Sequence, residues 1–242
     1  MKQISLIIII SALSLNIFAQ KDIVYEKVDE YDYFETQNYG VNGKHFLWGY
    51  YDVSFYTPNP FENQIGIKYG SSYSLTYGFK YKLKIFNWFS TGLDVNYNIH
   101  NFSFKNQFLS TYPSSANTSE KLVLNNIGSE FYLRFFIGKH GNTMGKYFDL
   151  GAYGTYNFSN RHILKIKNAT PNYFFANQQK IVNKNLAYIE NIQYGGVLRI
   201  GYNGYAIVAK YRFSDLFSND FLQIVTPNDL PRFTIGFELS IL

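Results

Sequence analysis

The sequence predicts an all-β fold, a transmembrane antiparallel up-and-down β-barrel of about eight strands, or ten. Three observations support this prediction. Aromatic residues make up 20% of the 242-residue chain, with 23 Tyr and 23 Phe, and such a composition favours strands over helices. One segment alternates between apolar and polar residues over nineteen positions, and the connections between the expected strands alternate between short and long.

The N-terminus has the features of a cleaved signal peptide. Lys2 supplies a positive charge, and a mostly apolar stretch follows at 4–18 and ends at the small residue Ala19. Ser and Asn interrupt this stretch, and it is shorter than the ~20 apolar residues of a spanning helix. We expect cleavage after Ala19, with a retained anchor as the alternative. The predicted parts are therefore a signal peptide at 1–19, an acidic periplasmic leader at 20–42 and a barrel domain at 43–242.

Charge is distributed unevenly along the chain. Six acidic residues lie within 21–35, whereas the net charge from position 36 onward is +8. A basic domain attracts acidic material such as lipopolysaccharide headgroups. The basic residues are scattered singly, so we expect no nucleic-acid partner. The chain has no Cys, which excludes disulfides, thiolate metal sites and lipid attachment at a cysteine.

The clearest strand pattern runs over 65–83. Its odd positions are almost all Ile, Leu, Tyr or Phe, and its even positions are Gly, Ser, Thr or Lys. A helix would distribute these residues around its circumference, whereas a strand separates them onto two faces. Strands of soluble sheets usually stop at about 3 to 10 residues, so this length favours a barrel that crosses a membrane.

The same alternation predicts the other strands. They are expected near 46–56, 88–104, 122–138, 147–158, 186–202, 205–213 and 232–242. Asn203-Gly204 suits a two-residue type I′ turn, because both central residues of that turn need positive φ.

Short and long connections alternate along the chain. The links at 84–87, 139–146 and 203–204 are short, and those at 105–121, 159–185 and 214–231 are long. Short periplasmic turns and long outer loops are typical of outer-membrane barrels. We therefore expect both termini in the periplasm. Segments 163–167 and 221–226 could form a further hairpin, which would make ten strands.

The last ten residues resemble the C-terminal strand that the barrel assembly machinery of the outer membrane recognises. Thr234 and Gly236 occupy its polar and glycine positions, Leu239 and Ile241 its apolar positions, but the terminal Leu242 is not aromatic. Together with the Ile-Phe-Ala-Gln end of the signal segment and the richness in Asn, Lys, Tyr and Phe, the mature chain resembles the small outer-membrane β-barrels of Bacteroidota, the PorT-like group and OmpX-like relatives. The resemblance implies a Gram-negative outer membrane, recognition by the assembly machinery and membership in a group that includes accessory components of protein secretion.

Charged residues at inward-facing positions of the expected strands form the first candidate site. We expect a lumen polar network of Asp52, Lys68, Lys80, Asp94, Glu130, Arg134, Asp149, Arg199, Lys210, Arg212 and Glu238. An eight-stranded barrel has room inside only for its own side chains, and buried charges must be paired. The network therefore predicts a closed, salt-bridged interior, with a narrow pore for small polar solutes as the alternative.

An outer-membrane lipid-modifying enzyme is the second alternative. Barrel deacylases use a His-x-Ser arrangement, and none of His45, His100, His140 and His162 is followed by Ser at that spacing. No acidic cluster has the spacing of a calcium loop. We therefore predict no catalytic residue, no cofactor and no metal site.

The long loop at 159–185 is the second candidate site, because it combines basic and aromatic residues. These are Arg161, His162, Lys165, Lys167, Tyr173, Phe174, Phe175 and Lys180. They could contact lipopolysaccharide, a glycan or an envelope protein partner, or simply lie in the headgroup layer among the other outer-membrane lipids. The sequence thus predicts a non-enzymatic outer-membrane barrel that serves as an accessory or binding component of the cell envelope, in a secretion or assembly system.

Overall fold

A computed structural model describes residues 40–58, 64–105, 118–138, 143–167, 178–224 and 228–241. Strands dominate these residues, and none of their helices is long and apolar enough to cross a membrane. The strands are β1 His45–Tyr56, β2 Tyr73–Phe86, β3 Phe89–Ser103, β4 Thr118–Ile137, β5 Lys146–Lys167, β6 Gln178–Lys184, β7 Ile192–Tyr202, β8 Tyr205–Arg212 and β9 Phe233–Ile241. Two short helices, η2 Tyr69–Ser71 and α3 Asn219–Ile224, accompany them.

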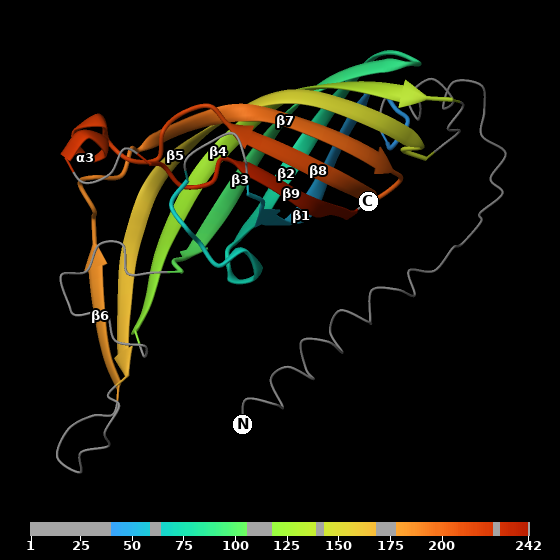
Figure 1. The fold of residues 1–242 in the computed structure, drawn as a ribbon. Helices are drawn as coiled ribbons and strands as arrows, with labels where there is room; N and C mark the ends of the chain where they lie inside the picture. The colour runs from blue at the N-terminus through green and yellow to red at the C-terminus, as the bar shows by residue number, and fades with distance from the viewer. Residues whose placement is uncertain are drawn as a thin grey trace, which may run out of the picture. The chain divides into compact units, whose positions relative to one another are not determined.

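Eight of these strands close into a ring. Each pairs antiparallel with its neighbour along the chain, in the order β1, β2, β3, β4, β5, β7, β8 and β9, and β9 pairs back with β1. The ninth strand, β6, lies outside the ring and pairs with the far end of β5 (Figure 1). The predicted antiparallel up-and-down barrel with eight strands in its ring is therefore confirmed, and the ten-strand alternative is wrong.

The strands have an apolar outer face and a polar inner face. On β2, Tyr77 and Phe79 are exposed outside, whereas Thr76 and Lys80 are buried inside. The two-residue turn predicted between β7 and β8 is also present, since Tyr202 pairs with Tyr205. Asn203 has a φ of 53°, but Gly204 is not among the described glycines with positive φ, so only the first central residue fits the predicted type I′ turn.

The second strand is shorter than the sequence pattern predicts. It begins at Tyr73, and η2 interrupts the alternation just before it. Ile67 is buried and bridges to Phe104, so it belongs to the interior and not to the lipid-facing row. Lys68 is exposed, and its placement in the lumen is therefore wrong. The physical reason is that the chain leaves the strand ladder before Tyr73, so odd and even positions no longer correspond to the outer and inner faces.

The fifth strand is longer than predicted, and the loop expected at 159–185 is largely absent. β5 continues to Lys167 and returns as β6. Asn126 on β4 faces Asn157 and the preceding Asn125 faces Ser159, so Phe158 has no partner on β4. This β-bulge exchanges the two faces of β5, so that odd positions point inward before it and even positions after it. The hairpin arm expected at 221–226 is wrong where it is described, because α3 covers Asn219–Ile224.

Candidate functional site

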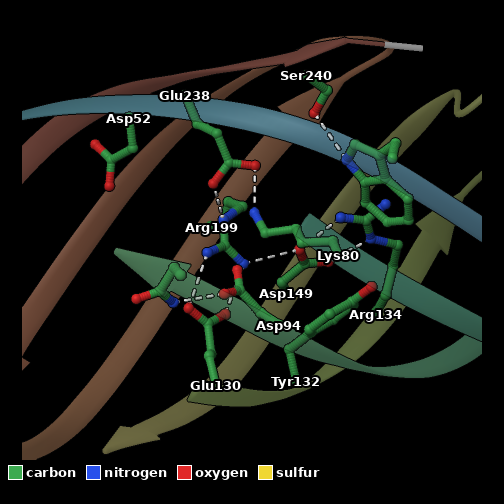
Figure 2. A network of polar contacts seen from close by, with 12 residues as sticks. Asp52, Lys80, Asp94, Glu130, Tyr132, Arg134, Asp149, Arg199, Glu238 and Ser240 are labelled. Carbon is green, nitrogen blue, oxygen red and sulfur yellow. Dashed lines mark hydrogen bonds and ion pairs between the residues drawn. The ribbon is translucent and has the colours of Figure 1, made fainter. Parts of the chain in front are cut away.

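Arg199 on β7 is the centre of a charge network inside the barrel (Figure 2). Its guanidinium donates to both carboxylate oxygens of Glu130 on β4, at 3.0 and 3.2 Å. It also donates to Asp149 on β5 at 3.2 Å, and its Nε lies 2.8 Å from Glu238 Oε2 on β9 as an ion pair without hydrogen-bond geometry. One arginine thus joins the carboxylates of three other strands.

Two further ion pairs extend this network. Arg134 on β4 donates to both oxygens of Asp149, at 2.8 Å each, and its guanidinium lies 3.7 Å from the ring centre of Tyr147. Lys80 on β2 pairs with Glu238. Figure 2 shows these residues pointing toward one another from different strands of the ring. The buried charges of these three ion-paired groups, around Arg199, Arg134 and Lys80, are stabilised because each lies beside a partner of opposite sign.

Most of the predicted network residues lie in the interior. The sequence-predicted residues buried there are Asp52, Lys80, Asp94, Glu130, Arg134, Asp149, Arg199, Arg212 and Glu238, and Lys210 is partly buried. Lys210 pairs with Asp52 at 2.5 Å. Arg212 is separate from the Arg199 network, because it pairs with Asp229 at 3.1 Å toward the loop end.

The sequence interpretation missed three charged interior residues, Lys82, Asp229 and Glu120, the last of which lies at the loop end beside His162. Lys82 is buried beside Lys80 on the same face of β2 and donates to the carbonyl of Val41. Lys82 continues the even, inward-facing positions of β2, so the alternation alone could have identified it as an interior residue. Asp229 carried no such signal, because it lies in a long connection with no alternating pattern.

Both ends of the interior are filled by apolar side chains. At the turn end, Trp48, Tyr132, Met144 and Tyr147 form a buried cluster. At the loop end, side chains from strands and connections form a second cluster, which we call the apolar cap. Its buried members are Tyr56, Ile65, Ile67, Phe102, Phe104, Leu122, Leu124, Ile189, Leu216, Phe217 and Leu230.

A small cavity lies between the charge network and the apolar cap. Its volume is about 50 Å³, and its lining includes His100, Tyr153, Gln193 and Lys210. The amide nitrogen of Gln193 is buried there without a hydrogen-bond partner. A polar cavity needs only about 10–15 Å³ to hold one water, so this one has room for a few waters and not for a continuous channel.

Tyr188, beyond the end of the barrel wall, packs against the cap. Burial raises the pKa of its hydroxyl above the usual range, and the nearby Glu120 carboxylate adds to the shift. The hydroxyl therefore stays neutral, which fits its place against an apolar cluster.

The second predicted site is divided by the extension of β5. Arg161, Lys165 and Lys180 lie on the outer face of the β5–β6 hairpin. His162 does not: it is buried inside and lies 2.6 Å from Glu120, because the bulge at Phe158 turns even positions inward. The backbone of Lys167 ends β5, but its side chain lies outside the described residues, as do Tyr173, Phe174 and Phe175.

Metal-ligand geometry is absent from the part of the chain that the structure describes, where no three His, Asp or Glu side chains gather around a common point. No family model matches the sequence, and no curated protein sequence matches it. Among solved structures, the chain is similar to Ail, the attachment invasion locus protein of Yersinia pestis, at 11% identity and a TM-score of 0.29, over 81% of this chain and 93% of that one. The barrel architecture rests on the strand pairing described above, and it is that of the small outer-membrane β-barrels.

Proposed function

We propose that the protein is an integral outer-membrane barrel with a closed interior, which acts by binding at its loop end and not by catalysis or transport. The observation that carries this proposal is the inverted distribution of polarity. Large apolar side chains such as Leu93, Phe131 and Ile200 are exposed around the outer wall, while paired charges fill the interior. An outer face of this kind is stable in lipid and not in water.

Membership in the PorT-like group of Bacteroidota belongs to the same proposal. Its support is the C-terminal strand, which forms β9 and closes the ring against β1. Strand β9 would be the segment that the assembly machinery recognises, and both termini would lie in the periplasm beside the short turns.

The region where β4, β5 and β6 extend beyond the ring, which we call the protruding sheet, is the proposed binding surface. Among the described residues, β6 pairs with β5 alone, so its other edge offers backbone donors and acceptors to an envelope partner. This surface would serve an accessory role in secretion or assembly.

Two measurements test the proposal. Refolded protein in a planar bilayer should give no stepwise currents, because charges and two apolar clusters fill the interior, and single-channel steps would contradict the closed lumen. In cells, a photo-crosslinker at Asn183, which lies on the same face of the protruding sheet as the inward-facing His162, should capture one dominant envelope protein, while the same group at Ile207 on the outer wall should capture lipid. Lipid adducts alone at both positions would contradict the accessory role.

A further inference from the structure

The outward face of the protruding sheet carries five basic residues in three rungs. In the first rung Arg161 lies between Val123 and Lys184, and in the second Ile163 lies between Lys121 and Val182. In the third rung Lys165 lies between Ser119 and Lys180. By this register, no acidic residue shares the face. We call these five residues, Lys121, Arg161, Lys165, Lys180 and Lys184, the basic face.

Two of the rungs place like charges directly opposite each other. Arg161 faces Lys184 and Lys165 faces Lys180. Residues directly opposite on one face have Cβ atoms about 4.5–5.5 Å apart, and like charges at that distance are destabilising. None of the ion pairs among the described residues involves a residue of the basic face. The repulsion between these like charges is therefore relieved only by an anion from outside this part of the chain.

The position of the basic face indicates which anion it meets. Odd positions of β4 point outward along its whole length, so the face continues the wall on which Ile127 and Phe131 are exposed. The rung of Val123 stands four residues beyond Ile127, roughly 13 Å along the strand at 3.3 Å per residue. With a strand tilt of about 40°, this is roughly 10 Å above Ile127 along the membrane normal, which brings the basic face to headgroup level at the upper edge of the apolar wall.

The wall below the basic face also has a hollow. A shallow depression, open over most of its area, is lined by Ile127, Ser129, Gly154, Tyr156 and Ile192. It exists because Gly154 has open space where a side chain would project. An acyl chain can occupy this hollow while its headgroup reaches Arg161 and Lys184.

We propose that the basic face, with the hollow below it, binds the phosphate groups and an acyl chain of a phosphorylated lipid of the surrounding leaflet. This inference rests on the proposed function, since it requires the outer wall to lie in a membrane. Each basic residue near an anionic membrane surface contributes about 1 kcal/mol of attraction, which makes the combined effect of several residues measurable.

The test uses the full barrel in phosphatidylcholine nanodiscs that contain a small fraction of bisphosphorylated lipid A. After release into mild detergent, mass spectrometry counts the lipid A retained per barrel. Arg161→Gln/Lys165→Gln/Lys180→Gln/Lys184→Gln should retain at least about tenfold less than the parent chain. The matched control, Lys44→Gln/Lys146→Gln, removes exposed charges at the turn end and should retain the parental amount.

Further arms identify the ligand chemistry. Lipid A without phosphate should be retained no better by the parent than by the four-glutamine variant. Gly154→Val, which fills the hollow, should lower retention, whereas Ala152→Val, on the same face of β5 outside the hollow, should not. Equal retention of lipid A by parent and four-glutamine variant would overturn the inference, and so would binding of soluble polyglutamate without binding of lipid A.

Insertion is measured separately from lipid retention. Folded barrels that have entered the nanodisc are identified by heat-dependent migration in gels and by resistance to protease. Inserted barrels that retain no lipid A overturn this inference alone, whereas chains that cannot insert contradict the proposed function itself.

Discussion

Arg134 and Asp149 face each other directly across β4 and β5 and share two hydrogen bonds of 2.8 Å inside the barrel. Neither side chain is exposed to solvent. Removing one member of a buried pair leaves the other uncompensated, which typically costs about 3–5 kcal/mol. We expect Arg134→Leu to lower the free energy of unfolding by about 3 kcal/mol, because Arg199 still contacts Asp149.

Urea titration of the barrel in detergent measures this loss. The double variant Arg134→Leu/Asp149→Leu should be less destabilised than the sum of the single variants, since contacting residues are not additive. Strict additivity would show that the two side chains do not interact.

The ring of Tyr147 lies over Gly201 on the neighbouring strand β7. A Cβ atom added at Gly201 would come within 2.1 Å of the ring, and the guanidinium of Arg134 lies 3.7 Å from the centre of the same ring. Because the ring is confined, Gly201→Ala should lower the free energy of unfolding by about 1–3 kcal/mol. Gly154→Ala is the control, since nothing lies within 4 Å of its new methyl group. Equal urea midpoints for the two variants would contradict the prediction.

Asp229 holds the connection between β8 and β9 over the barrel. Its carboxylate accepts hydrogen bonds from Arg212 at 3.1 Å and from the backbone N–H groups of Leu216 at 3.2 Å and Leu230 at 2.8 Å. Both leucines belong to the apolar cap. Asp229→Ala should therefore release this connection while the ring stays folded.

Hydrogen exchange measures the release as faster exchange of the amides of Leu216 and Leu230, by about tenfold or more for the loss of roughly 1–3 kcal/mol. Asp215→Ala is the matched control, because Asp215 pairs with Arg232 at the surface, where an ion pair contributes little. Unchanged exchange in Asp229→Ala would show that the cap alone holds the connection.

Lys165 and Lys180 carry like charges and face each other across β5 and β6, which leads to a prediction that is independent of any lipid. In a neutral detergent, Lys180→Glu should raise the free energy of unfolding of the protruding sheet by about 0.2–1 kcal/mol, because it converts a like-charge pair into an opposite-charge pair. Lys44→Glu, at the turn end, should have no such effect. Hydrogen exchange of β6 amides reports the difference, and exchange that is faster in Lys180→Glu would contradict the repulsion.

The outer and inner faces of the barrel could be predicted from sequence wherever the strands are regular. On β2, β3 and β4, period-two alternation places Lys80, Asp94 and Glu130 inside without knowledge of the partners. The pairing itself could not be predicted. Arg134 contacts Asp149 and Arg199 contacts Glu130 only because of the register between strands, which depends on the lengths of the turns.

The structure at the loop end could not be predicted from period-two alternation, for a different reason. Most residues of the apolar cap come from connections, where burial follows tertiary packing and not a local period. Ile67 is therefore buried although it continues an outward-facing pattern, and Lys68 is exposed although it continues an inward-facing one. Strand β6 is short and polar, so it becomes a strand only by pairing with the extended β5.

The β-bulge at Phe158 absorbs one extra residue of β5 and so keeps the later side chains of this strand on their faces. With the bulge, His162 and Leu164 are buried inside, and Arg161 and Lys165 belong to the outer face. If Phe158 instead paired with Asn125 in an unbroken ladder, one residue of register would reverse every later side chain and place Arg161 and Lys165 beside the apolar cap without acidic partners. Deletion of Phe158 removes the extra residue, so Ser159 would follow Asn157 directly and still face Asn125. We therefore expect the deletion variant, like Phe158→Leu, to keep heat-dependent gel migration and protected β6 amides. A deletion variant that loses protection of the β6 amides would show that the bend of the bulge itself, and not the number of residues, positions the protruding sheet.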